Sequence, residues 1–479
     1  MISRTRGHAP DPTDTGCHGN PGCVIGGHFE SHRRETVPNR RARGPARRSR
    51  AGPREAVASA RQNPWHAAED DVLNWAGNVA FGAARRHRPS TRDELRLIVS
   101  EAARLRVLGT GHSFNRIADT DGDLVSLSGL PAEFDIDSTA SMVRVCGGLR
   151  YGEIVGRLHA AGFALPNLAS LPHISIAGAV ATGTHGSGVD NGNLATPVRA
   201  VELLTAAGED LTIDRSDPRF EGAVVSLGAL GVVTAVTLDL LPTFDIRQDV
   251  YEDLPFEVPL LDALADAYSV SLFTDFRANR FTQVWRKAIG ASAAPDEFIG
   301  ARAAAGKQHP IAGADPAACT DQAGVPGPWH ERLPHFRLDF TPSSGNELQS
   351  EFFVPRSGGA EALHALARLA PRIAPLLQVA EVRAIAGDDQ WVSPCSGRDS
   401  IAFHFTWQPQ ADAVMSLLPE LERALSGFEV RPHWGKLFTM APAAVRSAYP
   451  HMAQFVALAD ELDPGRKFRN EFLDTYLPR

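Results

Sequence analysis

The pattern of apolar and polar positions becomes regular only from about Trp75 onward. In residues 91–104, four apolar side chains recur at helical spacing behind Thr91, a residue type that caps helix N-termini. These four are Leu95, Ile98, Val99 and Ala102. A second helix is predicted over 152–162 and would end at Gly162.

Short runs rich in β-branched residues predict strands between these helices and after them. In the first half of the chain they cover residues 106–108, 123–127, 142–146, 198–205, 211–214 and 232–240. Because these strands do not alternate strictly with helices, the pattern favours an α+β architecture over a doubly wound parallel sheet.

The composition and the apolar pattern of the sequence change near Pro242. Residues 243–432 contain an Ala/Gly/Pro-rich stretch (289–328) and further strands and helices, and we expect a second α+β domain there. The chain would then return, over 433–479, to a first domain formed by residues 69–242. A length of 479 residues accommodates two such domains, each with its own core.

Composition narrows the class of protein. Hydrophobic residues make up 43% of the chain and charged residues 22%, which is typical of a soluble globular protein. No apolar run approaches the roughly 18 residues that a membrane span requires. The five cysteines are odd in number and scattered, which disfavours a disulfide framework and suits a reducing cytoplasm.

The first 68 residues differ from all the rest. They are rich in Arg, Gly and Pro without a periodic apolar face, and we expect a disordered basic extension. Residues 1–64 carry twelve arginines against five acidic residues, so the remainder must carry −15 to give the net charge of −8. An acidic body disfavours nucleic-acid binding. The spacing of Cys17 and Cys23 fits no zinc finger, and we expect no metal.

Two glycine-rich stretches carry the candidate chemistry. VLGTGHSFN (107–115) ends a strand in two glycines and presents His112. SLPHISIAGAVATGTHGSG (170–188) is dense in Gly, Ser and Thr, so its backbone N–H groups could cradle a pyrophosphate. Neither stretch matches the G-x-G-x-x-G fingerprint of a Rossmann fold. Taken alone, a tight buried loop that packs small residues is an equal alternative.

Together, these stretches resemble the flavin domain of the vanillyl-alcohol oxidase family, and within it the alditol oxidases, with the sugar-1,4-lactone oxidases as cousins. The likeness runs from about Trp75 to the C-terminus. It includes NWAGN (74–78), LPNLASLPHIS (165–175), SLGALGVVT (226–234), YSVSLFTDFR (268–277), GVPGPWHERLPHFR (324–337) and RPHWGKLFT (431–439). It implies a PCMH-type FAD-binding domain over 69–242 and a substrate-binding cap domain over 243–432.

The resemblance also assigns the cofactor contacts. His112 would hold FAD through one covalent bond from a ring nitrogen to the 8α-methyl group. Some members attach the flavin a second time through a cysteine, but that position here is Leu171, so a single link is expected. Cys146 is expected to be a buried small hydrophobe, and Ala169 to lie where oxygen approaches. The implied FAD-binding residues are Gly109, Thr110, Gly111, His112, Ser113, Ser170, Ser175, Gly178, Thr182, Gly183, Thr184, His185, Gly231 and Val233.

Paired polar residues interrupt two otherwise apolar strands of the second domain. In VAEVRAI (379–385) and in IAFHFTW (401–407), the polar residues are two positions apart and therefore share a face. The pairs are Glu381 with Arg383 and His404 with Thr406. Burying such groups is costly unless they meet one another or a polar ligand, which favours a pocket for a polyhydroxylated substrate. A solvent-exposed sheet face with a cross-strand ion pair is the alternative.

Lys436 follows Trp434 in an apolar setting that would lower its pKa if it were buried. The resemblance places it, with Ser170, against the flavin and the reacting hydroxyl. The same resemblance places the paired polar residues of the second domain in a polyol site.

The implied activity is FAD-dependent oxidation of the terminal hydroxyl of an alditol, such as xylitol or sorbitol, to the aldose. Hydride would pass to flavin N5, and O2 would be reduced to H2O2. Either His404 or Lys436 would take the hydroxyl proton, and either Arg383 or Lys436 would offset charge on the reduced flavin. Glu381 and Thr406 would bind neighbouring hydroxyls.

Three alternatives to this activity stay open. One is a gulono- or galactono-1,4-lactone oxidase or dehydrogenase with the same flavin domain. Another is a non-catalytic flavoprotein, and the third is nucleic-acid binding through the basic extension, which lacks interleaved aromatic residues. We expect a monomer whose partners are the polyol and O2, with no nucleic acid and no membrane.

Overall fold

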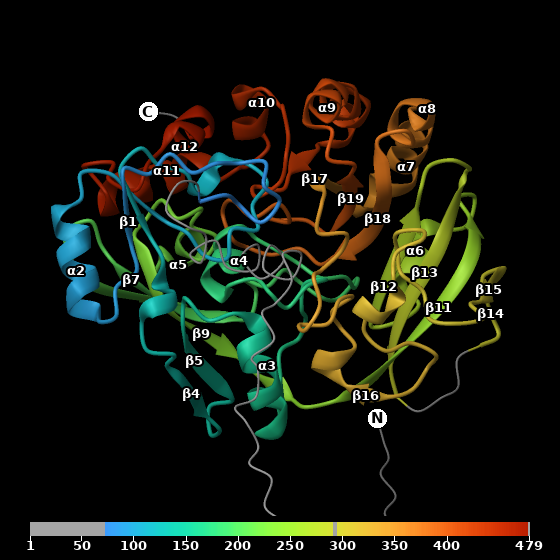
Figure 1. Ribbon diagram of the computed structural model, residues 1–479, viewed down its shortest axis with the longest axis horizontal. Coiled ribbons are helices and arrows are strands. Elements are labelled where there is room, and N and C mark those ends of the chain that lie inside the picture. The colour runs from blue at the N-terminus through green and yellow to red at the C-terminus, as the bar shows by residue number, and fades with distance from the viewer. Residues whose placement is uncertain (1–71, 291–294, 478–479) are drawn as a thin grey trace, which may run out of the picture. The chain divides into compact units, whose positions relative to one another are not determined.

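The computed structural model describes residues 72–290 and 295–477 (Figure 1). The predicted basic extension, with Cys17 and Cys23, lies outside the described residues. Helices and mixed sheets alternate irregularly along the described chain, which confirms the predicted α+β class.

Residues 85–242 form two main sheets. A three-stranded parallel sheet has the order β1 (Arg85–His87), β3 (Asp123–Val125), β2 (Leu105–Val107). A five-stranded antiparallel sheet has the order β4 (Phe134–Asp137), β5 (Met142–Cys146), β9 (Val232–Asp239), β7 (Val198–Leu204), β8 (Asp210–Asp214). All the strands predicted for this part of the chain are present, with ends that differ by at most a few residues.

Helices connect these strands and pack against them. The predicted helix α2 (Arg92–Glu101) begins at Thr91, whose hydroxyl accepts from the Glu94 backbone N–H, and it buries Leu95 and Val99. Helix α3 (Tyr151–Ala160) is followed by Gly162 at φ +85°, a conformation that glycine adopts without strain. The short helices α4 (Ile176–Ala181) and α5 (Phe220–Ala223) complete the set.

The strand pair β6 (Phe163–Ala164) and β10 (Leu241–Pro242) precedes a much larger antiparallel sheet. The large sheet draws all ten of its strands from Asp245–Pro432, in the order β14-β15-β11-β13-β12-β18-β19-β17-β20, with β16 paired to β11. The bounds are β11 (Asp245–Pro255), β12 (Ser269–Thr274), β13 (Arg280–Ile289), β14 (Glu297–Phe298), β15 (Ala301–Ala303), β16 (Gly327–Pro328), β17 (Leu348–Pro355), β18 (Leu377–Ile385), β19 (Ser400–Trp407) and β20 (Arg431–Pro432).

One face of the large sheet is apolar and covered by helices. These are α6 (Leu260–Ala265), α7 (Gly359–Ala367), α8 (Ala370–Ile373) and α9 (Ala411–Leu425) (Figure 1). On β19, Phe403 and Phe405 belong to the hydrophobic core that includes residues of α7 and α9. Gly359 lies so close to Ile401 of β19 that a Cβ at this position would overlap it. His404, at the alternate position, therefore points to the opposite face of the sheet.

The C-terminal residues pack against the N-terminal sheets. Helices α10 (Pro442–Ser447), α11 (Met452–Leu462) and α12 (Glu471–Tyr476) follow the large sheet. The Leu105 backbone N–H donates to the Lys467 carbonyl at 2.8 Å, and the Arg106 guanidinium donates to the Phe468 carbonyl at 2.7 Å. Short 3-10 helices lie at Arg116–Ala118, Leu127–Gly129, Pro316–Ala318, Trp329–Glu331, Arg356–Gly358 and Ser426–Phe428.

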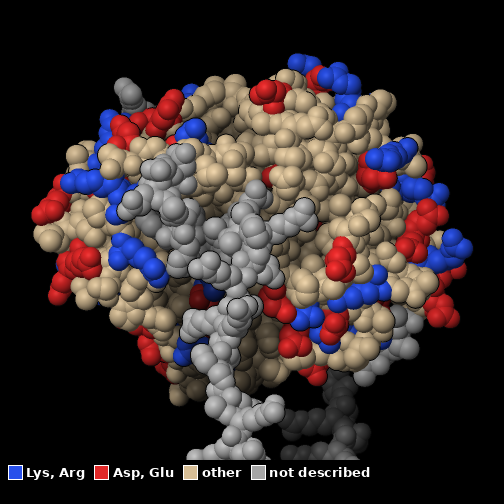
Figure 2. Space-filling model, in the orientation of Figure 1, with Lys and Arg blue, Asp and Glu red and all other residues tan. Residues whose placement is uncertain are grey.

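Charges of both signs are interspersed on the face drawn in Figure 2, around a broad uncharged area. Many of the charges are paired at the surface, as in Arg104 with Asp121 at 2.7 Å. Within the described residues, no helix has the length and apolar character to cross a bilayer.

Candidate active site

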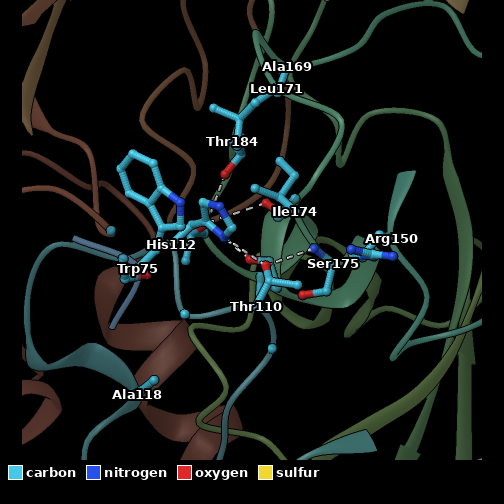
Figure 3. Close-up of a pocket in the computed structure, with 18 of the residues that line it drawn as sticks. Trp75, Thr110, His112, Ala118, Arg150, Ala169, Leu171, Ile174, Ser175 and Thr184 are labelled. Carbon is cyan, nitrogen blue, oxygen red and sulfur yellow. Dashed lines mark hydrogen bonds between the residues drawn. The ribbon is translucent and has the colours of Figure 1, made fainter. Parts of the chain in front are cut away.

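A cavity of about 480 Å³ lies between the two glycine-rich stretches and the polar face of the large sheet. Figure 3 shows lining residues from both stretches, among them Thr110, His112, Ser175 and Thr184. Thirteen of the fourteen predicted cofactor-binding residues line it, as do the five polar residues predicted for the substrate site in 381–436. The exception is Gly183, which adopts φ +62° after α4 and packs against Pro394, at 3.0 Å from where a Cβ would lie.

The His112 ring is held rigidly in this cavity. The Trp75 indole stacks on it at 5.4 Å with an interplanar angle of 17°, and the Thr110 hydroxyl lies 3.0 Å from Nδ1 (Figure 3). Nε2 is buried and has no hydrogen-bond partner among the described residues. Burial lowers the pKa of His112 to about 3, so the ring is neutral and has a lone pair available.

The two glycine-rich stretches touch beside this ring. The Ser175 backbone N–H donates to the Thr110 hydroxyl at 3.3 Å. A Cβ at Gly109 would overlap the Ser175 hydroxyl oxygen, so a larger residue at position 109 would force that hydroxyl to turn away. Gly111, at φ +71°, turns the chain so that its carbonyl accepts from the Trp75 backbone N–H at 2.8 Å. These contacts explain why glycines flank His112.

Polar side chains form a row across three strands of the large sheet. Glu381 on β18 lies directly opposite His404 on β19, and His404 lies opposite Glu351 on β17. Residues directly opposite in antiparallel strands share a face, so all three point into the cavity that they line. The predicted Glu381 and His404 are thus neighbours, and the solvent-exposed alternative is wrong because Glu381 is only 4% exposed.

Arg383 joins the two carboxylates of this row. Its guanidinium donates to Glu351 at 2.6 Å and lies 3.5 Å from Glu381. Burial opposes the charge on Arg383, but Glu381 and Glu351 outweigh it and raise the pKa of the guanidinium. Burial also opposes ionisation of both carboxyls, but Arg383 chiefly holds the pKa of each below its usual range. The three groups therefore form a buried ionised cluster.

Lys436 and His404 meet at a residue that the sequence analysis did not select. The Gln349 side-chain oxygen accepts from Lys436 and lies 3.0 Å from His404 Nε2, while its NH2 group donates to Glu347. An amide oxygen only accepts, so His404 Nε2 carries a proton. Thr406 lies directly opposite Gln349 on the neighbouring strand.

Burial lowers the pKa of both candidate proton acceptors, His404 and Lys436. It lowers the pKa of His404 to about 3 and that of Lys436 to about 8. The Lys436 ammonium also lies 4.8 Å from the centroid of the Phe114 ring, a cation–π contact. Lys436 therefore titrates nearer neutral pH than His404 does.

Gln349 and Glu351 could have been found from the sequence. In LQSEFFV (348–354) they are two positions apart and so share a strand face, although Ser350 between them is also polar and makes the alternation weaker than at Glu381 and Arg383. No comparable signal marks His335, whose Nε2 lies 2.8 Å from Glu381 Oε1, because the contact joins a loop to a distant strand.

His185, Glu351 and His433 bring three potential metal-ligand atoms within 4.8 Å of one another. His185 Nε2 lies 3.2 Å from Glu351 Oε1, the same oxygen that accepts from Arg383. The guanidinium therefore competes with a metal ion for the Glu351 oxygen that lies nearest His185.

The remaining predicted residues also line the cavity. Ala169 and Leu171 lie next to Ser170, whose hydroxyl accepts from Arg383 at 3.4 Å. Cys146 is 5% exposed, as predicted, and burial raises the pKa of its thiol, which keeps it protonated.

These residues fit FAD. The buried, unpartnered Nε2 of His112 requires a partner that the described residues do not supply, and the cavity runs on from it along both glycine-rich stretches.

Comparisons with known proteins agree with this site. A family model for FAD binding domains matches residues 83–214, and one for D-arabinono-1,4-lactone oxidase matches residues 345–476. An alditol oxidase from Streptomyces sp. is 54% identical over 406 residues, which cover 84% of this chain and 98% of that protein. The L-gulono-1,4-lactone dehydrogenase of Mycobacterium tuberculosis is 30% identical over 422 residues, covering 83% of this chain and 97% of that protein.

Solved structures share the fold at low sequence identity. Cholesterol oxidase from Brevibacterium sterolicum superposes with a TM-score of 0.69 at 16% identity, covering 85% of this chain and 96% of that one. Xylooligosaccharide oxidase from Myceliophthora thermophila C1, in complex with xylobiose, gives 0.67 at 13%, covering 87% and 97%. Both superpositions cover most of each chain and, together with the match to the FAD binding domain model, confirm the predicted fold.

Fold and site together define an FAD-dependent oxidoreductase that acts on CH–OH donors. The chain belongs to the alditol oxidase family, close to the gulonolactone oxidases and dehydrogenases. The enzyme class and the family both confirm the prediction made from the resemblance of the two glycine-rich stretches.

Proposed function

We propose that the protein oxidises the terminal hydroxyl of an alditol, such as xylitol or sorbitol, to the aldose and reduces O2 to H2O2. The observation that carries this proposal is the buried ionised cluster of Glu381, Arg383 and Glu351, which faces the cavity that His112 also lines. A cavity wall of this kind suits a ligand with many hydroxyl groups, because each buried charge then gains a hydrogen-bond partner.

When bound, FAD accepts the hydride removed from the substrate carbon and returns the electrons to O2. The chain's own residues orient the alditol. The ionised Glu381 accepts from one substrate hydroxyl, and the hydroxyls of Thr406 and Ser170 bind its neighbours. A substrate that lacks one of these hydroxyls leaves a buried group unpaired and is rejected.

Lys436 takes the proton of the reacting hydroxyl in this proposal. Its pKa of about 8 lies close to the operating pH, whereas a pKa of about 3 makes His404 a poor acceptor. His404 instead donates from Nε2 to Gln349, which holds Lys436 in place.

His112 anchors the cofactor through a single 8α bond in this proposal. Support comes from its neutral, buried ring, whose orientation is set by Trp75 and Thr110. The second attachment position is occupied by Leu171, which has no nucleophilic atom. We further propose a monomer, and a cytoplasmic location in keeping with the free thiols of Cys146, Cys319 and Cys395.

Oxidation or dehydrogenation of a sugar-1,4-lactone is the second candidate function. It is favoured by the match of residues 345–476 to the D-arabinono-1,4-lactone oxidase model, because this segment contributes most of the polar wall. Oxygen uptake and the anaerobic reduction of a dye acceptor, each measured with xylitol, sorbitol, glycerol and gulono-1,4-lactone, test both candidates. Faster uptake with an alditol supports the proposal, and uptake with the lactone alone rejects it.

A further inference from the structure

Lys287 is a buried lysine outside the cavity lining, and no carboxylate among the described residues is bonded to it. It lies on β13, two strands from Glu381, and is 1% exposed. Its ammonium donates to the Leu333 carbonyl and lies 3.1 Å from His335 Nδ1. A lysine is almost never this buried unless it is paired, so its contacts call for an explanation.

His335 connects Lys287 to the cavity. Its Nε2 lies 2.8 Å from Glu381 Oε1, and its backbone N–H donates to the Ser170 carbonyl at 2.8 Å. The rings of Phe273 and Trp285 pack edge-on against it, at 5.6 and 5.1 Å. The imidazole therefore cannot turn away from Glu381 without disturbing two buried aromatic residues.

The direction of the two hydrogen bonds that His335 makes follows from the protonation of Glu381 and of His335 itself. Arg383 and His335 hold the pKa of Glu381 low against the effect of burial, so its carboxylate only accepts, and His335 Nε2 must carry a proton. Burial, together with Lys287, lowers the pKa of His335 to about 4, so the ring is neutral and Nδ1 bears a lone pair. Nδ1 therefore accepts from Lys287.

The charged and titratable groups around His335 are consistent with donation from Lys287 to His335 and from His335 to Glu381. Lys287, Glu381 and Arg383 are the charges that act on it. Cys319 lies near Lys287, and burial raises the pKa of its thiol, which leaves it neutral. Burial lowers the pKa of Lys287 to about 7, but a neutral amine keeps N–H groups that can still donate to His335.

We propose that Lys287 and His335 are positioning residues that form a one-way donor relay, in which Lys287 donates to His335 and His335 donates to Glu381. The relay rests on the proposed alditol site, where it fixes which oxygen of Glu381 accepts from His335 and which is free to accept from a substrate hydroxyl. The preference for a substrate hydroxyl at this oxygen then depends on three residues: Glu381, His335 and Lys287.

A cycle of variants tests the relay in the FAD-loaded protein. Lys287→Met removes the first donor, and Glu381→Met removes the last acceptor, because a thioether is at most a weak acceptor. Because the relay acts only through Glu381, Lys287→Met should raise the KM for xylitol about tenfold in the wild-type background and change it less than about twofold in the Glu381→Met background. Equal factors in the two backgrounds would overturn the relay.

Substitutions of His335 give an independent readout that does not depend on Lys287. Glutamine supplies both an acceptor and a donor, so His335→Gln should keep KM within about threefold of wild type, whereas His335→Phe should raise it at least about tenfold. Equal losses in the two variants would show a packing role only. If the wild type oxidises gulono-1,4-lactone and not xylitol, the proposed function fails, and the same cycle measured with the lactone still decides the relay.

Discussion

The guanidinium of Arg383 on β18 donates to the carboxylate of Glu351 on β17 at 2.6 Å, across the intervening strand β19. Both side chains are almost completely buried, at 6% and 2% exposure. Breaking a buried pair by removing one charge typically costs about 3–5 kcal/mol, since the other charge stays in a dry environment. This pair therefore stabilises the polar wall as well as shaping it.

Replacing Glu351 by glutamine should lower the free energy of unfolding by about 3 kcal/mol, because Arg383 loses one of its two counter-charges. Urea unfolding of the FAD-loaded protein measures the change. The matched control is Asp121→Asn, which removes a surface partner of Arg104 and should cost less than about 1 kcal/mol. Equal costs for the two variants would contradict a buried ion pair.

Glycine at position 109 should be required for cofactor binding. Gly109→Ala places a Cβ against the Ser175 hydroxyl oxygen, so the flavin content of the purified protein should fall severalfold. Adding Ser175→Ala removes that oxygen and should restore much of the flavin. Gly306→Ala, where a Cβ meets nothing within 4 Å, should leave flavin content unchanged. Failure of the double variant to recover flavin would reject this packing explanation.

Turnover should depend on the deprotonation of Lys436. A group that accepts a proton works only in its neutral form, so kcat/KM for xylitol should rise with pH up to the pKa of about 8 and then level off. Lys436→Met should abolish the rising limb and most of the activity. A profile that is flat or falling from about pH 6 to about pH 9 would assign the proton to another group.

Gln349 should affect the pH at which kcat/KM for xylitol rises. Its side-chain oxygen accepts from Lys436 and so favours the charged ammonium form. Gln349→Leu removes the acceptor, and the midpoint of the kcat/KM profile should move to lower pH. An unchanged midpoint would mean that the contact does not influence Lys436.

The flavin should stay with the polypeptide after denaturation. Acid precipitation of the wild-type protein should give a yellow pellet and a colourless supernatant, because the bond to His112 survives unfolding. His112→Ala should release all its flavin into the supernatant. A colourless wild-type pellet would exclude the covalent link.

Much of this site could be predicted from local patterns. The alternation of Glu381 with Arg383 and of His404 with Thr406 reports a strand face directly, and the register of β18 with β19 then brings the two pairs together. The capped helix α2 was equally readable, because Thr91 and the apolar spacing lie within one short window.

Contacts between distant segments could not be predicted in this way. His335 and Glu381 are 46 residues apart and His335 and Lys287 are 48, and each residue alone looks like an ordinary polar position in its own segment. Gly183 shows the opposite case, since it belongs to a glycine-rich stretch that otherwise lines the cavity but turns toward Pro394. The composition predicted a stretch whose backbone N–H groups could cradle a pyrophosphate. The path of the backbone decides which of its glycines face the cavity.

The most direct measurement of the proposed activity follows oxygen uptake, peroxide and aldose formation together when xylitol is added to the purified yellow protein. The proposed activity predicts that all three appear in equal amounts and that gulono-1,4-lactone is oxidised more slowly. Absence of xylitol-dependent uptake by a protein that carries its full complement of flavin would contradict it.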